Sequence, residues 1–363
     1  MCLNHQLQNF DHTKADGFAE RLISALNEGA LCVMLSIGHR TGLFDHLDGQ
    51  PPITSSALAK HAGLNERYVR EWLNALVAAR VIDYQPREQT YYLPAEHANW
   101  LTRRSSDGNI AVFAQYIPIM GTVEDDIVAC FKSGGGVPYE RFPRFHEVMA
   151  EDSGQTVLTS LEEHILPLVP GLVEKLQQGI RVLDVGCGRG RAINLLARLY
   201  PNSIFVGIDL SQEAIDFATS EARQQGLDNV GFIARDVTDF DQDEHIVQFD
   251  LITTFDAVHD QARPLNVLKG IFNALKDDGI YLMQDIHASS NVENNLDHPV
   301  APLLYAVSTT HCMTVSLAQG GEGLGTMWGQ EKAKELLTAA GFSRIEIHQL
   351  EHDFQNDYYV IQK

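Results

Sequence analysis

The stretch VLDVGCGRGR, from Val182 to Arg191, decides the fold of this chain. It begins as the apolar run of a buried strand, and Gly186, Gly188 and Gly190 follow at alternate positions. Glycine suits a backbone that turns sharply and comes close to a ligand, because no Cβ stands in the way. The residues AINLLARLY after the turn have helical periodicity, and a helix N-terminus offers unpaired N–H groups to an anion. The pattern predicts a ligand-binding turn between a strand and a helix.

The chain downstream of Gly179 alternates short apolar runs with amphipathic, helix-like segments. Near-continuous Val, Ile and Leu in these runs indicate strands that are buried on both faces of a parallel sheet. Strands that alternate with helices indicate βαβ units, so we expect an α/β domain here. The predicted strands are residues 181–186, 204–210, 229–236, 249–255 and 279–286.

Three aspartates near the ends of these strands indicate the cofactor. Asp209 ends the second strand, where a carboxylate can accept both hydroxyls of a ribose. A dinucleotide prefers G-x-G-x-x-G, but here the third glycine comes one residue early and Arg191 takes its place. Asp184 would repel a pyrophosphate but suits the amino group of a methionine moiety, and Asp236 could accept from an adenine amine. The three acids together predict S-adenosylmethionine rather than NAD.

The upstream half reads mostly as helices and contains a winged helix-turn-helix pattern. Residues 53–63 are predicted to form one helix, with Thr54 as N-cap and Gly63 as C-cap. A second predicted helix and two short β-like pieces follow. Between Thr54 and Tyr84 the sequence contains four basic and three acidic residues. A DNA-reading helix usually has a concentrated basic face. We therefore favour a scaffold for dimerisation and for the substrate lid over DNA binding, which stays the alternative.

The amino-acid composition limits which binding partners and which cellular compartment we expect. The 363 residues include 27 Lys+Arg and 48 Asp+Glu, a formal net charge of −21. This charge disfavours nucleic acid and anionic membranes as partners. The longest apolar stretch, 29–38, is about half of what spans a bilayer, and residues 1–14 lack the pattern of a secretory signal. Five scattered cysteines without a C-x-x-C pair fit reduced thiols in a cytoplasm.

On these motifs the chain resembles class I S-adenosylmethionine-dependent methyltransferases, and it is similar to a bacterial, mycobacterial-type group that places a winged-helix domain before that fold. The caffeate-type and hydroxyindole O-methyltransferases resemble it more distantly. The resemblance implies a Rossmann-like sheet of seven strands, in which residues 343–350 and 357–363 form an antiparallel pair, and a homodimer through the N-terminal helices. The apolar stretch 29–47 supports that dimer. The implied cofactor-binding residues are Met149, Asp184, Gly186, Cys187, Gly188, Asp209, Leu210, Asp236, Val237 and Phe255.

Within this set the resemblance implies separate roles. Asp184 and the first two glycines hold the methionine end, Asp209 the ribose, and Asp236 with Val237 the adenine. Met149 lies in a segment, 142–154, that resembles the one closing over the cofactor, although it could equally be an ordinary buried methionine. Cys187 could be a reactive thiol at a helix N-terminus, but its small size between two glycines explains it more simply.

The candidate catalytic residues follow the fourth predicted strand. Transfer to a hydroxyl requires removal of a proton, and histidine is the usual general base. His259 and Asp260 match the His-Asp pair of the O-methyltransferases, so the resemblance implies His259 as the base. The chain then departs from that family, because Gln261 stands where it has tryptophan. A capping or structural role for His259 is the alternative.

An insertion over residues 287–330 separates the fifth strand from the helix that follows. Such connections normally take about 2–6 residues, so we expect a lid at the ligand-bearing edge. The candidate substrate-pocket residues in it are His298, Tyr305, His311 and Trp328. The spacing of the histidines matches no helical pair of metal ligands, and we expect no metal.

These observations predict a two-domain enzyme. We expect a helical winged-helix dimerisation domain over 1–132, a linker with cofactor-covering helices over 133–180, and a methyltransferase domain over 181–363. The expected reaction is methyl transfer from S-adenosylmethionine to a small-molecule acceptor, at oxygen, with His259 as base. The alternatives are a winged-helix transcription regulator that senses S-adenosylmethionine and an NAD-dependent oxidoreductase.

Overall fold

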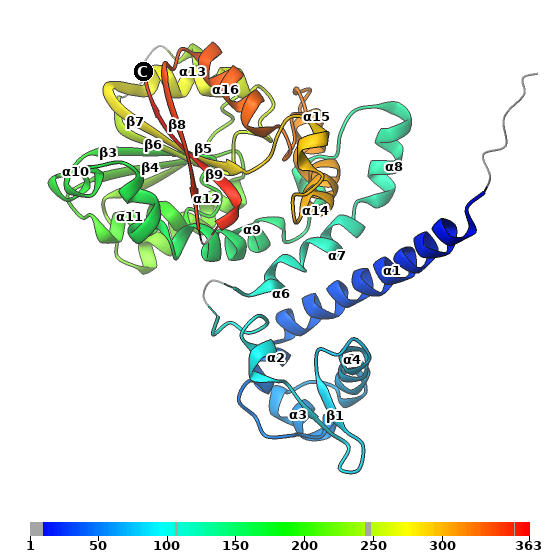
Figure 1. Ribbon diagram of the computed structural model, residues 1–363. Coiled ribbons are helices and arrows are strands. Elements are labelled where there is room, and N and C mark those ends of the chain that lie inside the picture. The colour runs from blue at the N-terminus through cyan, green and yellow to red at the C-terminus, as the bar shows by residue number, and fades with distance from the viewer. Residues whose placement is uncertain (1–9, 106–107, 244–247, 352) are drawn as a thin grey trace, which may run out of the picture. The chain divides into compact units, whose positions relative to one another are not determined.

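The computed structural model describes residues 10–105, 108–243, 248–351 and 353–363. The chain forms two compact units, one ending at Pro118 and the other spanning Ile119–Lys363 (Figure 1). The second unit therefore begins before the predicted boundary at residue 132. Helix α8 (Glu124–Ser133) belongs to it, and Arg141 pairs with Asp126 of this helix at 2.7 Å. Residues 1–9, with Cys2 and most of the segment searched for a secretory signal, lie outside the described residues.

The first unit contains the predicted winged helix-turn-helix. Thr54 accepts a hydrogen bond from the N–H of Ala57, and Gly63 ends the helix in the left-handed conformation, so both predicted caps are present. The wing is the antiparallel pair β1 and β2. The elements of this unit are α1 (His12–Thr41), α2 (Leu43–Leu47), α3 (Ser55–Ala62), α4 (Glu66–Ala78), β1 (Asp83–Gln85), β2 (Thr90–Tyr92), α5 (Ala95–Ala98) and α6 (Ile110–Phe113), with α7 (Tyr116–Gly121) at the boundary.

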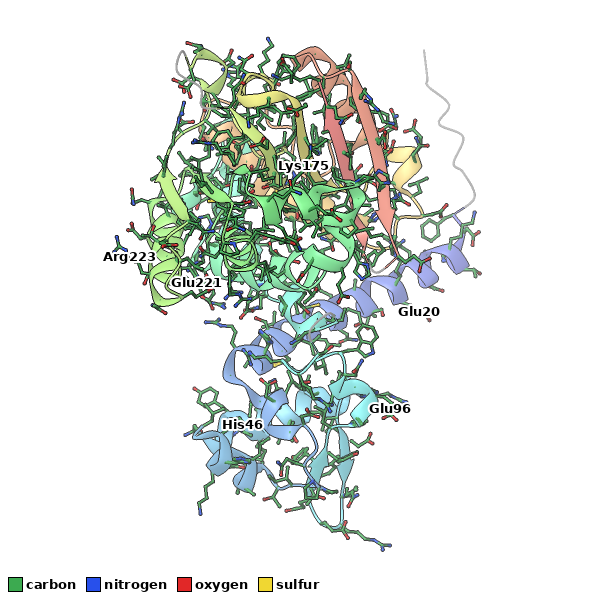
Figure 2. The ribbon with its side chains drawn as sticks, turned by 90° about the vertical axis from the view of Figure 1, so that its left-hand side faces the viewer. Glu20, His46, Glu96, Lys175, Glu221 and Arg223 are labelled. Carbon is green, nitrogen blue, oxygen red and sulfur yellow. The ribbon has the colours of Figure 1, made fainter. Side chains whose placement is uncertain are left out.

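Helix α1 divides into two parts of different burial. Its C-terminal part, with α2, supplies Leu35, Phe44 and Leu47 to the core of the unit, so the apolar stretch 29–47 is largely explained by its own domain. The N-terminal part is exposed, as Glu20 illustrates (Figure 2). Among the described residues α1 is the one helix that could cross a membrane by length and composition. That is weak evidence, because core helices of soluble proteins pass the same test.

The second unit is built on one seven-stranded sheet, as predicted. Its strand order is β5-β4-β3-β6-β7-β9-β8, and the first five run parallel while β9 is antiparallel to both of its neighbours. The strands are β3 (Arg181–Val185), β4 (Ile204–Asp209), β5 (Val230–Ala234), β6 (Phe249–Phe255), β7 (Leu275–Ile286), β8 (Arg344–Leu350) and β9 (Asp353–Gln362).

Helices cover both faces of this sheet. In β3, Leu183 packs in the core cluster that includes α13 and α16, whereas Val182 packs in the cluster that includes α10 and α11. This alternation is the period of a strand buried on both sides. The helices are α10 (Leu172–Gln178), α11 (Arg191–Leu199), α12 (Gln212–Gln224), α13 (Pro264–Ala274) and α16 (Gly329–Ala340), and η5 (Phe240–Gln242) lies before β6.

Two irregular segments complete the second unit. Residues 133–138, predicted as a linker, are packed on the insertion: Val137 donates its N–H to Thr314, and a Cβ at Gly136 would lie 2.0 Å from the Thr314 carbonyl oxygen. The first segment, between α8 and α10, contains η1 (Tyr139–Arg141), α9 (Phe145–Ser153), η2 (Gly154–Leu158), η3 (Leu161–Ile165) and η4 (Leu166–Leu168). The second, between β7 and α16, contains η6 (Val292–Asn295), α14 (Ala301–Val307), η7 (Ser308–Cys312) and α15 (Met313–Ala318).

Candidate active site

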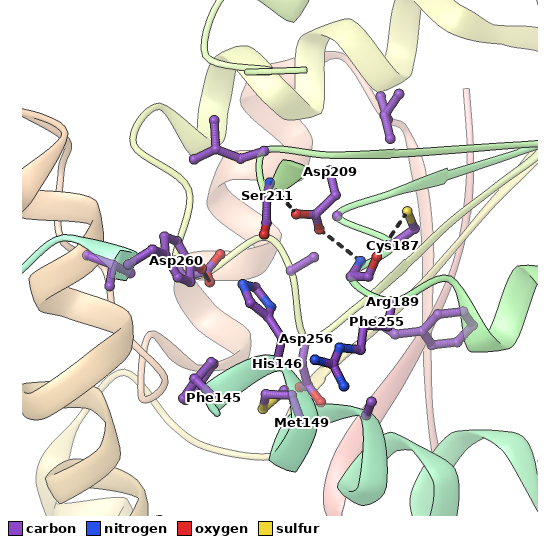
Figure 3. Close-up of a pocket in the computed structure, with 18 of the residues that line it drawn as sticks. Phe145, His146, Met149, Cys187, Arg189, Asp209, Ser211, Phe255, Asp256 and Asp260 are labelled. Carbon is purple, nitrogen blue, oxygen red and sulfur yellow. Dashed lines mark hydrogen bonds between the residues drawn. The ribbon is translucent and has the colours of Figure 1, made fainter. Parts of the chain in front are cut away.

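A cavity of about 690 Å³ lies at the carboxyl ends of β3, β4 and β6 (Figure 3). This volume is typical of a site for a small molecule or cofactor, and the end of a parallel sheet is the expected place for one. All ten residues predicted to bind the cofactor line it: Met149, Asp184, Gly186, Cys187, Gly188, Asp209, Leu210, Asp236, Val237 and Phe255.

The glycine turn forms one wall of the cavity. Gly186 and Gly188 have φ of 74° and 52°, a region that other residues rarely adopt. A Cβ on Gly188 would meet no atom within 4 Å, so this glycine leaves open space beside the cavity. Arg191 begins α11 and donates to the carbonyl oxygen of Ala150 in α9, at 3.0 Å. The residue that departs from the dinucleotide pattern therefore ties the turn to the helix that carries Met149.

Asp209 and Asp236 are held by their local backbone. Asp209 accepts hydrogen bonds from the N–H groups of Gly188 and Ser211, each at 2.8 Å (Figure 3). Asp236 accepts one from the N–H of Thr238 at 2.8 Å. Backbone donors fix the direction of a carboxylate without neutralising its charge. Both acids therefore present negative charge along the same wall.

Asp184 differs from these two because it is buried. Its described partner is neutral, the hydroxyl of Thr253 at 2.8 Å. Burial raises the pKa of Asp184 to about 7, and the Thr253 hydrogen bond opposes that shift. A buried carboxylate is costly unless a cation pairs with it. A ligand with an ammonium group at this point would supply that cation.

Cys187 is positioned for packing rather than for reaction. Burial, together with Asp184 and Asp209, raises its thiol pKa well above the ordinary value. A thiol with a raised pKa stays protonated and is a poor nucleophile. A Cβ on Gly207 would lie 2.9 Å from its sulfur, so the space around it is small.

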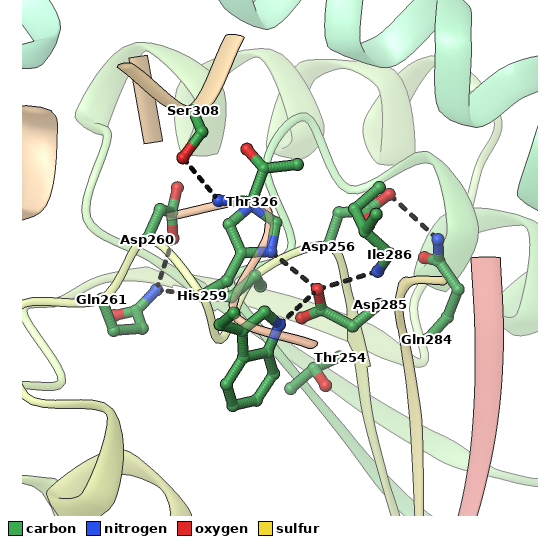
Figure 4. A network of polar contacts seen from close by, with 12 residues as sticks. Thr254, Asp256, His259, Asp260, Gln261, Gln284, Asp285, Ile286, Ser308 and Thr326 are labelled. Carbon is green, nitrogen blue, oxygen red and sulfur yellow. Dashed lines mark hydrogen bonds and ion pairs between the residues drawn. The ribbon is translucent and has the colours of Figure 1, made fainter. Parts of the chain in front are cut away.

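His259 lies beside the cavity rather than on its wall. It is 4% exposed and is not among the described residues that line the cavity, whereas Asp260 is. Its Nδ1 donates to Oδ1 of Asp285 at 2.8 Å (Figure 4). Burial alone lowers the pKa of His259, but the Asp285 carboxylate and Cys312 outweigh it and leave the pKa well above its ordinary value.

Two known families match this chain. One is the Rv2258c-like winged HTH domain, over residues 29–103, and the other is a methyltransferase domain, over residues 176–349. The chain joins a winged HTH domain to a methyltransferase domain. The prediction of this domain combination is confirmed.

Individual relatives support the methyltransferase domain. A ubiquinone biosynthesis O-methyltransferase of Actinobacillus pleuropneumoniae serotype 7 is 31% identical over 112 residues, 30% of this chain and 47% of that enzyme. The chain thus spans about half the length of this relative. Mitomycin 7-O-methyltransferase MmcR has a TM-score of 0.69 at 17% identity, over 97% of this chain and 100% of that one. Human N-acetylserotonin methyltransferase in complex with S-adenosylmethionine has a TM-score of 0.67 at 17% identity, over 98% and 99%. At such identity the two structures show the fold, which covers both domains.

The predicted substrate-pocket residues of the methyltransferase domain do not come together. Trp328 is in the core and donates its indole N–H to Asp285 at 2.9 Å. The Tyr305 hydroxyl accepts a hydrogen bond from Asn295 at 3.2 Å within the insertion, and the His298 ring lies 6.1 Å from that of His287, tilted by 34°. None of the four is among the described residues that line the cavity. Aromatic character alone could not separate wall residues from the packing behind them.

His311 lies behind an aromatic wall whose residues were not singled out from the sequence, although most of them lie in the segment 142–154 that was predicted to cover the cofactor. Its ring stacks on Phe145 with centroids 3.4 Å apart, and Tyr139 and Phe142 meet it edge-on. Burial lowers its pKa well below the ordinary value, and the neighbouring His146 and His259 add to that shift, so the imidazole is neutral. The lining residues Tyr139, Phe142, Phe145 and His146 are called the acceptor side below, and the glycine turn with Asp184, Asp209 and Asp236 the cofactor side.

One hydrogen bond joins the acceptor side to the loop after β6. The Tyr139 hydroxyl donates to Asp260 at 2.5 Å, and both residues line the cavity. Burial raises the pKa of Asp260 to about 6, although His259 and the Tyr139 hydrogen bond lower it. This contact joins η1, which lies before α9, to the loop that carries His259.

One side-chain group in the described residues has the geometry to hold a metal ion. Ligand atoms of Asp256, His259 and Asp285 lie within 4.8 Å of one another. Nδ1 of His259 already forms a hydrogen bond with Asp285 at 2.8 Å, so a cation bound through Nδ1 would have to displace that contact. Asp256 directly follows β6 and Asp285 is the last residue but one of its parallel neighbour β7, and neither was singled out from the sequence.

Proposed function

We propose that this chain is an S-adenosylmethionine-dependent methyltransferase that acts on the oxygen of a small-molecule acceptor. The observation that carries the proposal is the buried Asp184 carboxylate beside the glycine turn, in a cavity that already contains Asp209 and Asp236. S-adenosylmethionine has an ammonium group, a ribose and an adenine, which match these three acids in turn. The methyltransferase domain found by family comparison supports the same conclusion.

The residues present fit this cofactor. Asp184 would bind its ammonium, and the open space at Gly188 leaves room for the methionine end. Asp209 would accept from the ribose, and Asp236, with the main chain of Val237, would bind the adenine. Met149, Leu210 and Phe255 would cover the cofactor from the sides. A pyrophosphate in place of the methionine would face the Asp184 carboxylate, which argues against NAD.

The acceptor side supports a planar, aromatic acceptor. Phe145 and His146 of α9 and Tyr139 of η1 offer ring surfaces, and Tyr139 stacks on His146 with centroids 5.7 Å apart. Aromatic walls bind flat rings through burial and offset stacking. The mitomycin 7-O-methyltransferase and N-acetylserotonin methyltransferase have the same fold, and their names indicate methylation of small molecules. We therefore propose a phenol-like or hydroxyindole-like acceptor.

The bound cofactor would supply a methyl group on a sulfonium, which is already activated, so the protein has to align the acceptor, exclude water and remove a proton. His259 as general base stays a prediction. Its support is Asp285, whose Oδ1 accepts from His259, from the Trp328 indole and from the N–H of Ile286. Three donors hold this carboxylate rigidly, and it fixes the imidazole in turn. We propose that Asp285 holds the His259 imidazole in a fixed orientation beside the group that takes the proton.

The winged HTH domain is proposed as a dimerisation scaffold. Phe18, Leu22, Ile23 and Leu26 of α1 are 49–75% exposed, an apolar surface that a second copy of the chain would cover. In α4, where a DNA reader would place its basic face, Arg67 pairs with Glu71 and Arg70 with Glu66. We therefore propose a cytoplasmic homodimer without a nucleic-acid partner.

Thermal unfolding with S-adenosylhomocysteine and, separately, NAD tests the cofactor. A ligand at 100 times its dissociation constant adds about 2.7 kcal/mol to the folded state. We expect a rise in melting temperature with S-adenosylhomocysteine, no rise with NAD, and the same rise for the Asp277→Asn control, whose side chain is fully exposed. A flat response to S-adenosylhomocysteine would contradict the proposal. Transfer of labelled methyl from S-adenosylmethionine to phenol, catechol, 3,4-dihydroxybenzoate and 5-hydroxyindole then tests the acceptor class.

A further inference from the structure

Asp256 is a carboxylate on the cavity wall for which the predicted site has no role. It directly follows β6 and lines the cavity, next to Phe255 and Ala257. Figure 3 shows it beside Met149, below the cofactor side. His259, the residue singled out from the sequence, does not line the cavity. Asp256 is therefore better placed than His259 to touch a bound acceptor.

The backbone at Asp256 is in an uncommon conformation. Its φ of 49° lies in the left-handed region, where Asp and Asn are tolerated better than most residues. Such conformations cost energy and cluster at functional sites, where the surrounding structure enforces them. Here the N–H of Asp256 donates to the carbonyl oxygen of Gln284 at 3.1 Å, which fixes the turn at the strand end.

Only one of the two carboxyl oxygens of Asp256 has a hydrogen-bond partner among the described residues. Oδ2 of Asp256 accepts from the amide of Gln284 at 3.0 Å, whereas Oδ1 is buried and has no hydrogen-bond partner among the described residues (Figure 4). Oδ2 of the fully buried Asp285 is in the same condition. Two buried acceptors with nothing to accept are costly, and a proton on one of them reduces that cost.

We infer that Asp256 is the catalytic residue that takes the proton from the acceptor hydroxyl, and that His259, acting through Asp285, is a positioning residue. The inference rests on the proposed function and names the proton acceptor within it. The acceptor oxygen forms the bond to the methyl carbon, the carbon–sulfur bond breaks, and its electron pair stays on sulfur. The hydroxyl proton passes to the Asp256 carboxylate and returns to water after the products leave, so no oxidant or reductant is needed.

The charges around Asp256 support this assignment. Burial raises its pKa to about 8, the Asp285 carboxylate of β7 and Asp152 of α9 act in the same direction, and His259 and the Gln284 amide oppose them. A base is most effective when its pKa lies near the working pH. An ordinary exposed aspartate, with a pKa near 3.9, would be too weak a base for a hydroxyl.

The variant Asp256→Asn tests the inference. Asparagine keeps the shape of the side chain and tolerates the left-handed backbone, so the fold should be retained. With the phenol that the wild type methylates fastest, we expect the methylation rate to fall by about 10²–10⁴-fold. The dissociation constant for S-adenosylhomocysteine should stay within threefold of wild type, as it should in Asp277→Asn. A rate within threefold of wild type would overturn the inference, and so would an equal loss of S-adenosylhomocysteine affinity.

A second readout does not depend on activity. Because the pKa of Asp256 is higher in the folded chain than in the unfolded chain, the wild type binds an extra proton when folded between about pH 4 and 8. Its stability should therefore fall relative to Asp256→Asn as pH rises through that window. Parallel melting curves across it would overturn the inference. Failure of the proposed function looks different: S-adenosylhomocysteine would then stabilise neither protein.

Discussion

The two sides of the cavity are built in different ways. The cofactor side comes from strand ends β3, β4 and β5 and the turns that directly follow them, so each side chain is placed by its own neighbours in sequence. The acceptor side comes from η1 and α9, packed against the insertion after β7. The cofactor side is therefore a local construction, and the acceptor side depends on contacts between distant segments.

This difference has a functional consequence. Changes on the cofactor side should alter cofactor affinity, whereas changes on the acceptor side should alter the Michaelis constant for the acceptor and leave cofactor affinity intact. His259 is not among the described residues that line the cavity, so its loss should alter the rate constant alone. Four variants test this separation.

Among these four variants, the largest effect is expected for His259→Ala. Removing the imidazole leaves Asp285 without one of its three donors and disturbs proton removal, so we expect kcat to fall by about 100-fold. The control is His298→Ala, because His298 is outside the cavity lining. Single-turnover methyl transfer measures the rate. A drop under threefold in His259→Ala would contradict a role in proton removal.

Asp184→Asn should act on the cofactor side alone. Loss of a charge-assisted contact to the ammonium costs about 1.5–3 kcal/mol, or roughly 10–100-fold in the dissociation constant for S-adenosylhomocysteine. Isothermal titration calorimetry measures it.

The same variant tests a pH dependence. Because the pKa of Asp184 is about 7, protons compete with the ammonium at lower pH. Wild-type affinity should be constant above pH 7 and fall by up to about tenfold for each pH unit below it. Asp184→Asn should lack this dependence. A wild-type affinity that is flat from pH 8 to 6 would show that the carboxylate does not meet the cofactor.

Tyr139→Phe tests the acceptor side. The ring and its stacking on His146 remain, but the hydrogen bond to Asp260 is lost. We expect the acceptor Michaelis constant to rise by about tenfold, because the Tyr139 ring would no longer be held to the loop after β6 and would present the acceptor with a less fixed wall. S-adenosylhomocysteine affinity should stay within twofold. A change in both constants would show that the two sides are not separable.

The smallest effect on the cavity is expected for Leu22→Glu combined with Leu26→Glu on α1. Two charges on the exposed apolar surface should dissociate a homodimer, as sedimentation velocity can show. Cofactor affinity should remain within twofold, because the cofactor side lies entirely within the second unit. A wild-type chain that sediments as a monomer would contradict the dimer.

The sequence predicted what local chemistry determines. Glycines at alternate positions after a strand specify a turn, and the following acids were placed in register because parallel strands end at one edge. The same reasoning identified the helix caps Thr54 and Gly63. Sheet topology followed from the alternation of strand and helix together with the family resemblance.

The sequence did not predict what depends on packing between distant segments. Trp328 was expected in the pocket, but it supports Asp285 from the core. Asp285 itself carries a signal, an acid at the end of a predicted strand, that could have paired it with His259. The family resemblance placed the segment of Phe145 over the cofactor, but no local pattern marks Tyr139 or Phe145 as wall residues. Contacts with His311, in the insertion after β7, bring the two rings together.

The position of β9 between β7 and β8 has a consequence for synthesis of the protein. The strand that carries Asp285 has β6 as one neighbour and β9 as the other, and β9 runs to Gln362. On the ribosome, β7 therefore keeps an open edge until almost all of this sequence has been translated. A chain interrupted before β9 would contain the whole glycine turn and still lack the support of its proton-handling residues.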